Sequence, residues 1–345
     1  MNDKIYDEES KRDKHKTMNK LLVILGPTAT GKTDLALRLA KKFNGELVSC
    51  DSRQVYMGLD IGTGKLPGKG KWEVRRGRRF WEIGGIRVWM YDVLKPDKQY
   101  TVYDYVKDAN RAIGKIGKSG KLPIVVGGTG FYLKALLEGL PNLLIPVDQV
   151  LRKKLEKLSS KELKEKLQTL SIKRWEKMNQ SDRGNPRRLI RAIELGASGR
   201  INQRIEGVFG LGRKFDILKI GLSAPRKILY ERANERVIDR INQGMIEEAN
   251  KLHEKGLSLK RMRQLGLEYG VLVDYLSGKI STEDELTRIL QNKIHGYIRR
   301  QLTWFKKEKD VLWFDITDEK YLENVEKKVS KWYHQVDDTK NRHLP

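Results

Sequence analysis

The segment GPTATGKT at residues 26–33 limits the possible folds of this chain more than any other feature. It matches the pattern G-x-x-x-x-G-K-[ST], which forms a phosphate-binding loop where a strand precedes it and a helix follows it. Both are expected here, because the apolar run LLVIL (21–25) comes first and an amphipathic segment begins at Lys32. This context favours a phosphate-binding P-loop over two ordinary glycine turns.

The loop predicts a site for a diphosphate group but leaves open which molecule supplies that group. Backbone N–H groups and the helix N-terminus attract phosphate oxygens, Lys32 adds a positive charge, and the Thr33 hydroxyl is a ligand for Mg²⁺. The residues expected to bind diphosphate are Gly26, Pro27, Thr28, Ala29, Thr30, Gly31, Lys32 and Thr33. ATP, GTP or another diphosphate ester would satisfy such a loop, since nothing in it reads a base.

Further short apolar runs predict the rest of a parallel sheet. They lie at 46–50, 86–93, 122–128 and 215–223, and helical patterns separate most of them. Short apolar strands that alternate with helices are typical of a doubly wound α/β fold, whose strands are buried on both faces. We therefore expect an α/β protein with a P-loop NTPase-like parallel sheet, and a last strand at 311–316.

The segment 148–205 departs from this alternation. It contains charged amphipathic helical patterns and no strand pattern, and it lies between two predicted strands. We predict a helical insertion domain there, within a core domain formed by 20–147 and 206–335. The charged segment 1–19 is expected to be a disordered basic tail, and the last residues, 336–345, a second tail.

The charge of the chain points to a polyanionic partner. Its 345 residues include 70 Lys and Arg against 45 Asp and Glu, which gives a net charge of +25 and a pI near 9.9. This excess is larger than solubility requires and favours nucleic acid. The single cysteine, Cys50, excludes a disulfide framework and a cysteine-based zinc site. We find no run long enough to span a membrane and no secretory signal, so we expect a cytoplasmic protein without membrane attachment. No protein partner is implied.

Two polar features follow predicted strands, at the edge where open α/β sheets bind ligands. Asp51 follows the run ELVSC, and Thr129 lies in GGTG (127–130) after the run LPIVV. Asp51 is a candidate general base or hydrogen-bond acceptor, although an aspartate before a serine also caps turns and helices. The glycines of GGTG allow a ligand to approach the backbone, but the same segment can be a turn with a helix cap.

Arginines at helical spacing form three basic stripes. In NPRRLIRAIE (185–194), Pro186 starts a helix on which Arg187 and Arg191 share a face. The other two stripes comprise Arg232, Arg236 and Arg240, and Lys293, Arg299 and Arg300. One such stripe is most often a solvated helix face, but three of them beside a P-loop in a strongly basic chain favour contact with RNA phosphates.

These segments together resemble the tRNA dimethylallyltransferase family, whose members prenylate adenosine 37 of certain tRNAs. The resemblance rests on GPTATGKT, DSRQVYMGLDIGTGK (51–65), IVVGGTGFYLKALLEGL (124–140), NPRRLIRAIE and RRQLTWF (299–305). The second of these is the most specific, and together they span about residues 21–314.

The resemblance implies that the P-loop binds dimethylallyl diphosphate rather than ATP and that a C5 prenyl group passes to adenine N6. Asp51 would accept the N6 proton and Thr129 would contact the same adenosine. Lys32, Arg236 and Mg²⁺ on Thr33 would stabilise the departing diphosphate. The residues expected to contact the tRNA anticodon stem-loop are Asp51, Ser52, Arg53, Gln54, Thr129, Arg152, Arg187, Arg188, Arg191, Arg263 and Arg300.

The chain also departs from the family pattern. Trp89, Met90 and Tyr91 stand where members commonly have a His-His pair before the aspartate that aligns with Asp92. The segment 69–83 is expected to be a loop that is longer and more basic than is usual in the family. Residues 294–296 and the surroundings of Arg263 match the family pattern only loosely. These departures bear on recognition of tRNA and not on the chemistry.

Two alternatives stay open. An adenylate isopentenyltransferase shares the P-loop and the aspartate but prenylates free AMP, ADP or ATP, and the basic insertion and net charge argue against it. An ATP-dependent kinase or an RNA-binding NTPase module would need a Walker B aspartate at a strand end. The strand expected at 122–128 ends in glycines instead, and only Asp51 could take that role.

Overall fold

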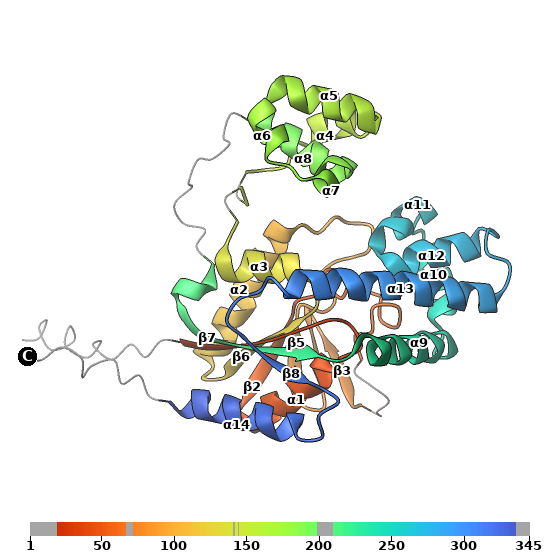
Figure 1. The fold of residues 1–345 in the computed structure, drawn as a ribbon. Coiled ribbons are helices and arrows are strands. Elements are labelled where there is room, and N and C mark those ends of the chain that lie inside the picture. The colour runs from red at the N-terminus through yellow and green to blue at the C-terminus, as the bar shows by residue number, and fades with distance from the viewer. Residues whose placement is uncertain (1–18, 67–71, 141, 144, 199–209, 336–345) are drawn as a thin grey trace, which may run out of the picture. The chain divides into compact units, whose positions relative to one another are not determined.

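The computed structural model describes residues 19–66, 72–140, 142, 143, 145–198 and 210–335. The chain divides into two compact units, one formed by residues up to Leu136 and from Gly212 onward, the other by Leu137–Leu211. The first is an α/β core unit and the second is built of helices (Figure 1). The expected tails lie outside the described residues, except for Asn19, which begins a strand.

The core unit is built on an eight-stranded sheet with the strand order β3-β4-β5-β2-β6-β1-β7-β8. The strands from β5 to β8 in this order run parallel, and the pairs β3–β4 and β4–β5 are antiparallel. The strands are β1 (Asn19–Leu25), β2 (Gly45–Ser49), β3 (Val74–Gly77), β4 (Phe80–Ile83), β5 (Ile86–Trp89), β6 (Leu122–Gly127), β7 (Phe215–Ser223) and β8 (Val311–Asp315).

Helices connect and cover these strands. In the core they are α1 (Lys32–Lys42), α2 (Val102–Lys118), α3 (Gly130–Glu138, which runs into the second unit), α9 (Arg226–Asn242), α10 (Met245–Glu254), α11 (Leu259–Met262), α12 (Leu267–Leu276), α13 (Glu283–Phe305) and α14 (Tyr321–His334). Two 3-10 turns lie at Leu211–Arg213 and Arg263–Leu265.

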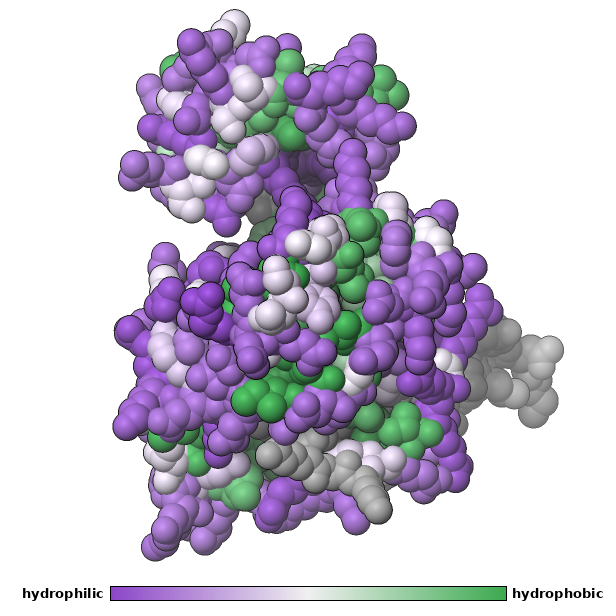
Figure 2. Space-filling model, turned by 90° about the vertical axis from the view of Figure 1, so that its right-hand side faces the viewer, coloured by the Kyte–Doolittle hydropathy of each residue, from purple (hydrophilic) through white to green (hydrophobic). Residues whose placement is uncertain are grey.

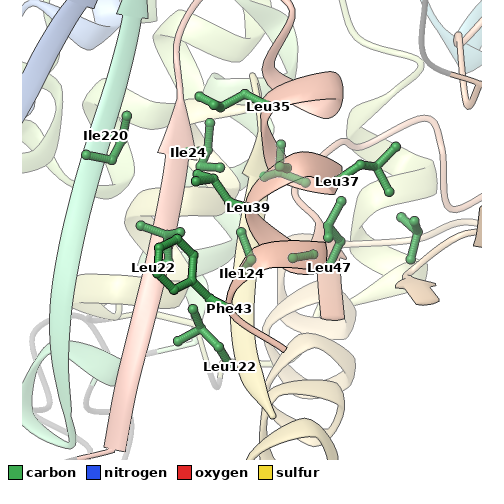
Figure 3. Close-up of a cluster of buried hydrophobic side chains, with 14 of the residues drawn as sticks. Leu22, Ile24, Leu35, Leu37, Leu39, Phe43, Leu47, Leu122, Ile124 and Ile220 are labelled. Atoms are coloured by element: carbon green, nitrogen blue, oxygen red, sulfur yellow. The ribbon is translucent and has the colours of Figure 1, made fainter. Parts of the chain in front are cut away.

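Both faces of the sheet are buried at its central strands. Leu22 and Ile24 of β1 pack with Leu35 and Leu39 of α1 in a core that also contains residues of β2, β6, β7 and α14 (Figure 3). Leu21, the residue before Leu22 on β1, points to the opposite face and is equally inaccessible to solvent. Burial on both faces explains why the strands are continuous apolar runs, and the predicted α/β fold with a parallel sheet is confirmed.

The segment 69–83 is not a loop where it is described. Residues 74–77 and 80–83 pair as the antiparallel hairpin β3–β4, which extends the sheet beyond β5. Trp81 and Ile83 join the core at 1% and 0% exposure, and this burial explains why the basic segment is ordered as strands. The strand expected at 86–93 is shorter, because β5 ends at Trp89 and the chain then adopts positive φ angles.

The second unit has a small core of its own. Its helices are α4 (Gln149–Leu155), α5 (Ser160–Leu170), α6 (Ile172–Glu176), α7 (Gln180–Arg183) and α8 (Pro186–Ala197). Leu163 and Leu167 of α5 pack against Leu189 and Ile193 of α8. The insertion expected at 148–205 falls within this unit, and its last residues, 199–205, lie outside the described residues.

On the face shown in Figure 2, hydrophilic side chains cover most of both units and hydrophobic patches are small. Among the described residues, none of the helices combines the length and the apolar character that a membrane span requires.

Candidate active site

The P-loop connects β1 to α1 through a backbone that requires glycine. Gly26 has a φ of 141°, and a Cβ there would lie 2.4 Å from the carbonyl oxygen of Leu222. The Lys32 side chain folds back over the loop, and its Nζ donates to the Pro27 carbonyl at 2.5 Å. Lys32 and Thr33 form the first turn of α1, where free N–H groups and the helix dipole favour an anion.

Asp51 lies near the P-loop, but β2, the strand before it, is not the neighbour of β1. β6 separates the two strands, so the segment after β6, here called the glycine loop (residues 127–130), lies between them. The N–H of Thr129 donates to the Cys50 carbonyl at 3.2 Å, and the N–H of Ser52 donates to the Thr129 hydroxyl at 3.3 Å. These bonds bring Asp51 and Thr129 together at the carboxyl edge of the sheet.

One oxygen of the Asp51 carboxylate caps the turn that follows. Its Oδ1 accepts hydrogen bonds from the N–H groups of Arg53 at 2.8 Å and Gln54 at 3.4 Å. Within the described part of the chain, no hydrogen bond engages the Oδ2 atom, and Asp51 lines a cavity. The capping role and the catalytic role considered for Asp51 are therefore compatible, with one oxygen for each.

The P-loop, the glycine loop and Asp51 share one cavity of about 990 Å³, within the range of small-molecule sites. The predicted site residues that line it are Thr28, Ala29, Gly31, Lys32, Thr33, Asp51, Ser52, Arg53, Gln54, Arg236 and Arg300. Gly26, Pro27 and Thr30 shape the P-loop without lining the cavity, and Thr129 contacts the lining residue Ser52.

The cavity has a crowded cationic wall. Burial, and then the charge of Arg236, lower the pKa of Lys32 to about 7. The neighbouring Arg240, and then burial, lower the pKa of Arg236 to about 9. Gly64 leaves space for both guanidinium groups, because a Cβ there would lie 2.1 Å from Arg240 and 2.6 Å from Arg236. Cations that repel one another in this way are stabilised by a bound polyanion.

Arg53 and Gln54 differ in how much of each side chain is free for a ligand. The Gln54 amide accepts from the Ser49 hydroxyl at 2.6 Å and donates to the Gly64 carbonyl at 3.2 Å. The guanidinium of Arg53 has no hydrogen bond or ion pair within the described ranges, and it lines the cavity.

Tyr297 and Gln301 of α13 are polar residues that line the cavity without having been predicted. Gln301 hydrogen-bonds to both the P-loop and the glycine loop. A neutral amide or a tyrosine in an amphipathic helix has no distinctive sequence pattern. The available signal was the position of Gln301 next to Arg300 in RRQLTWF.

Comparison with known proteins identifies the family. The IPP transferase family model matches residues 54–308, most of the chain. The chain belongs to the IPP transferase family. An isopentenyl transferase model also matches residues 19–85.

Similar relatives span nearly the same length. The tRNA dimethylallyltransferase of Streptococcus agalactiae is 39% identical over 90% of this chain and 97% of its own length. The tRNA dimethylallyltransferase 2 of Treponema denticola is 38% identical over 86% of this chain and 93% of its own. The crystal structure of a tRNA isopentenylpyrophosphate transferase from Bacillus halodurans is 30% identical, with a TM-score of 0.62, and covers 91% of this chain and 97% of that one. The resemblance inferred from the motifs is confirmed.

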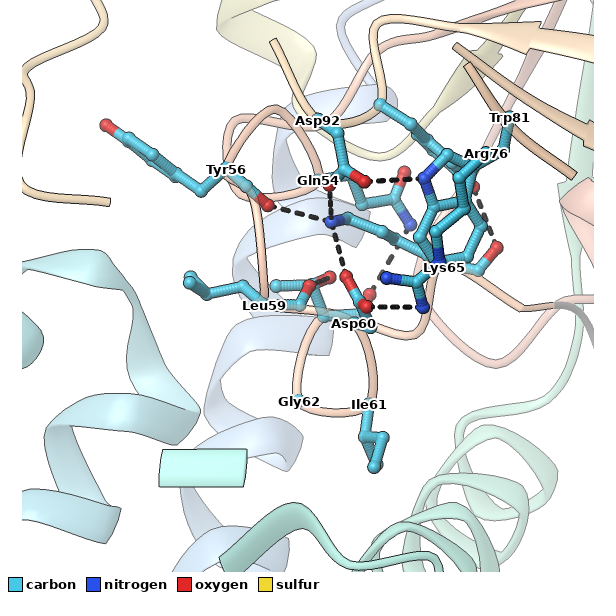
Figure 4. A network of polar contacts seen from close by, with 12 residues as sticks. Gln54, Tyr56, Leu59, Asp60, Ile61, Gly62, Lys65, Arg76, Trp81 and Asp92 are labelled. Atoms are coloured by element: carbon cyan, nitrogen blue, oxygen red, sulfur yellow. Dashed lines mark hydrogen bonds and ion pairs between the residues drawn. The ribbon is translucent and has the colours of Figure 1, made fainter. Parts of the chain in front are cut away.

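In this member of the IPP transferase family, the segment after Asp51 folds around a buried lysine (Figure 4). The Lys65 side chain is fully buried and donates to Asp60 at 2.7 Å and to Asp92. The indole N–H of Trp81 donates to the other oxygen of Asp92 at 2.6 Å. Arg76, which lines the cavity, pairs with Asp60 at 2.8 Å. Hairpin β3–β4 thus supplies one partner for Asp92, through Trp81, and one for Asp60, through Arg76.

Arg263, also predicted to contact tRNA, does not line the cavity. Its guanidinium pairs with Asp274 of α12 at 2.7 Å. This pair restrains the turn that leads into α12 and engages both terminal nitrogens of the Arg263 guanidinium.

The predicted arginines of the second unit differ in their partners. Arg152 makes two hydrogen bonds of 2.7 Å to the buried carboxylate of Glu194, and Arg191 contacts the same carboxylate at 3.2 Å. Arg188 pairs with an aspartate of α7. Arg187 is exposed, and the structure gives its guanidinium no partner among the described residues. Of this stripe, Arg187 is therefore the residue whose charge is most available to a ligand.

Proposed function

We propose that this protein transfers the dimethylallyl group of dimethylallyl diphosphate to N6 of adenosine 37 in the anticodon loop of tRNA and releases diphosphate. The main support is that a P-loop, a carboxylate with one unbonded oxygen and a cationic wall share one cavity in a member of the IPP transferase family. Relatives named tRNA dimethylallyltransferases favour tRNA over a free nucleotide as the acceptor. A tRNA acceptor also implies a cytoplasmic reaction.

The P-loop and the cationic wall would bind the diphosphate. As the allylic C–O bond breaks, negative charge develops on the leaving group, and we assign its stabilisation to Lys32 and Arg236, which line the cavity. A bound anion favours the charged form of Lys32 and so opposes the effects that lower its pKa.

Asp51 would act on the adenine. The N6 amine is a poor nucleophile because its lone pair is delocalised into the ring. As N6 bonds to the allylic carbon, the carbon–oxygen bond to diphosphate breaks and the N6 proton passes to the free oxygen of Asp51. Thr129, held beside Asp51 through Ser52, is the candidate contact to the same base. The adenine must leave its stack to reach them, at a cost of a few kcal/mol.

A divalent cation, with Mg²⁺ as our choice, fits the diphosphate site. Mg²⁺ keeps several waters and takes phosphate oxygens, so it needs few protein ligands. The described residues contain no group of three or more His, Cys, Asp or Glu suited to hold a metal by themselves. The Thr33 hydroxyl lines the cavity at the start of α1, and it would hold the ion, which neutralises diphosphate charge when bound.

Contacts to the anticodon stem-loop would come from both units. At the cavity, Arg53 and Arg300 have charges that can reach RNA, and Ser52 and Gln54 are close to the base site. On the second unit, Arg187 is the strongest candidate for a phosphate contact, with Arg188, Arg191 and Arg152 engaged in ion pairs. Phosphate contacts position the RNA and do not read its sequence.

Nucleoside mass spectrometry tests the proposal. Unmodified tRNA is incubated with the protein, dimethylallyl diphosphate and Mg²⁺, and we expect dimethylallyl adenosine at position 37, absent with the Lys32→Ala variant. Prenylation of AMP but not of tRNA would instead identify an adenylate isopentenyltransferase. Phosphate release from ATP without a prenylated product would identify a kinase or NTPase module.

A further inference from the structure

Helix α13 contacts both substrate-binding loops through one side chain. Gln301 is 6% exposed. Its Oε1 accepts a hydrogen bond from the Thr28 N–H at 2.9 Å, and its Nε2 donates to the Gly128 carbonyl at 3.0 Å. Thr28 belongs to the P-loop and Gly128 to the glycine loop, which follow the neighbouring strands β1 and β6.

The two partners require an amide at this position. Thr28 offers a donor and Gly128 offers an acceptor, so the side chain must both accept and donate. Glutamate could accept from Thr28 but would face the Gly128 carbonyl with a second oxygen. An apolar side chain would leave two partly buried backbone groups unpaired. Gly128 is part of the fit, since a Cβ there would lie 2.5 Å from the Gln301 amide nitrogen.

The same face of α13 contacts the next two residues of the glycine loop. Tyr297, four residues before Gln301, interacts with the Thr129 side chain. Trp304, three residues after Gln301, lies against Gly130, where a Cβ would come within 2.1 Å of the indole. Residues at these spacings share one face of a helix. α13 is therefore a rigid support for the glycine loop, and Gln301 extends that support to the P-loop.

We propose that Gln301 is a positioning residue that fixes the distance between the P-loop and the glycine loop, and with it the distance between the two reacting groups. This proposal deepens the proposed function and rests on it. The P-loop holds the diphosphate that leaves, whereas the glycine loop orients Thr129 and, through Ser52, the turn that contains Asp51. Each substrate can bind to its own loop without Gln301, but the attack of N6 on the allylic carbon requires both loops to keep their spacing. A misplacement of about 1 Å can cost roughly 100-fold in rate.

Kinetics of three variants test the positioning role. Gln301→Met keeps the shape and removes both hydrogen bonds, and Gln301→Glu keeps the bond to Thr28 alone. Gln291→Leu is the matched control on the same helix, away from the cavity. For Gln301→Met we expect kcat to fall by about 10- to 100-fold while KM for tRNA stays within about threefold. Gln301→Glu should lose kcat and also raise KM for dimethylallyl diphosphate, because it adds a negative charge beside the P-loop. Wild-type kcat in Gln301→Met would overturn the proposal.

Hydrogen exchange separates this proposal from the proposed reaction. The Thr28 amide should be protected in the wild-type protein and exchange at least about tenfold faster in Gln301→Met, while Gln291→Leu leaves it unchanged. Equal protection of Thr28 in all three proteins would refute the bridge whether or not tRNA is prenylated. Faster exchange of Thr28 in Gln301→Met, together with a wild-type protein that makes no prenylated tRNA, would refute the reaction and retain the bridge. Faster exchange throughout the core of Gln301→Met, with kcat and Tm falling together, would show general destabilisation instead.

Discussion

At the scale of single residues, the two oxygens of Asp51 allow a clean test of its role. Asparagine keeps the Oδ1 atom that accepts from Arg53 and Gln54, so Asp51→Asn should fold with the same turn. It cannot take a proton, and we expect the single-turnover rate to fall by about 10²- to 10⁴-fold. Binding of tRNA should change little. A near-normal single-turnover rate would mean that Asp51 is only a turn cap.

The lowered pKa of Lys32 predicts that diphosphate binding depends on pH. This pKa is about 7 in the free protein, and a bound anion favours the charged form and raises that pKa. At a pH between the pKa of Lys32 in the free protein and its pKa in the complex, binding of the diphosphate takes up a proton. The affinity for the diphosphate should therefore weaken as the pH rises above about 7, by at most about tenfold per pH unit. Near pH 9 the loss of charge from Arg236, whose pKa the neighbouring Arg240 and burial lower to about 9, should weaken binding as well.

Calorimetry of dimethylallyl diphosphate binding at pH 8, in two buffers of different ionisation enthalpy, measures this proton uptake directly. Lys32→Met is the control and should bind more weakly with less uptake. Uptake equal to that of the wild type would assign the proton to the ligand or to another group.

The sequence predicted well which residues surround the site. It predicted less well which groups each of those residues contacts. Lys32, Asp51 and Arg236 were found because a motif or a strand end fixes their surroundings. The partners of Arg152 and Arg191 could not be found, because a shared buried carboxylate depends on how α4 and α8 pack. The roles of these residues in binding tRNA remain predictions.

At the scale of elements, prediction succeeded where burial leaves a recognisable hydrophobic pattern in the sequence. The strands β1, β2 and β6 are buried on both faces and therefore read as apolar runs. Hairpin β3–β4 was missed because its strands have four residues each and no residue of VRRG is buried. Its order comes from tertiary packing of Trp81, which no local pattern reveals.

We expect the buried carboxylate of Glu194 on α8 to stabilise the second unit. This carboxylate is 2% exposed and holds both Arg152 and Arg191. Glu194→Gln removes the charge from these bonds and should destabilise the unit by about 1.5–3 kcal/mol, the usual value of hydrogen bonds to charged groups. Glu165→Gln on the exposed side of α5 should change stability by less than about 0.5 kcal/mol.

Hydrogen exchange of α8 and α5 measures this effect, because two units need not unfold in one step. Equal protection in Glu194→Gln and Glu165→Gln would show that the carboxylate does not stabilise the unit.

At the scale of the whole molecule, the net charge of +25 makes RNA binding depend on salt, and single arginines can be tested through that dependence. Each phosphate contact adds about 0.7–0.9 to the slope of log K against log salt. Arg187→Ala should lower the slope by up to about one unit, because Arg187 is exposed and has no partner within the described residues. Arg191→Ala should lower it less, since Glu194 and the carbonyls of Asn142 and Ile145 already engage its guanidinium.

Replacing Arg187 and Arg191 together shows whether one or both of these arginines contact RNA phosphates. A loss of nearly two units would mean that Arg191 leaves Glu194 to contact RNA, whereas a loss of about one unit would assign the contact to Arg187 alone. In either case, kcat at saturating tRNA and the affinity for dimethylallyl diphosphate should stay unchanged, because uniform binding energy affects KM more than kcat. Titrations of the wild type and the three variants at several salt concentrations decide between them. Parallel lines with equal intercepts would show that α8 presents only a solvated basic face and that RNA binds elsewhere.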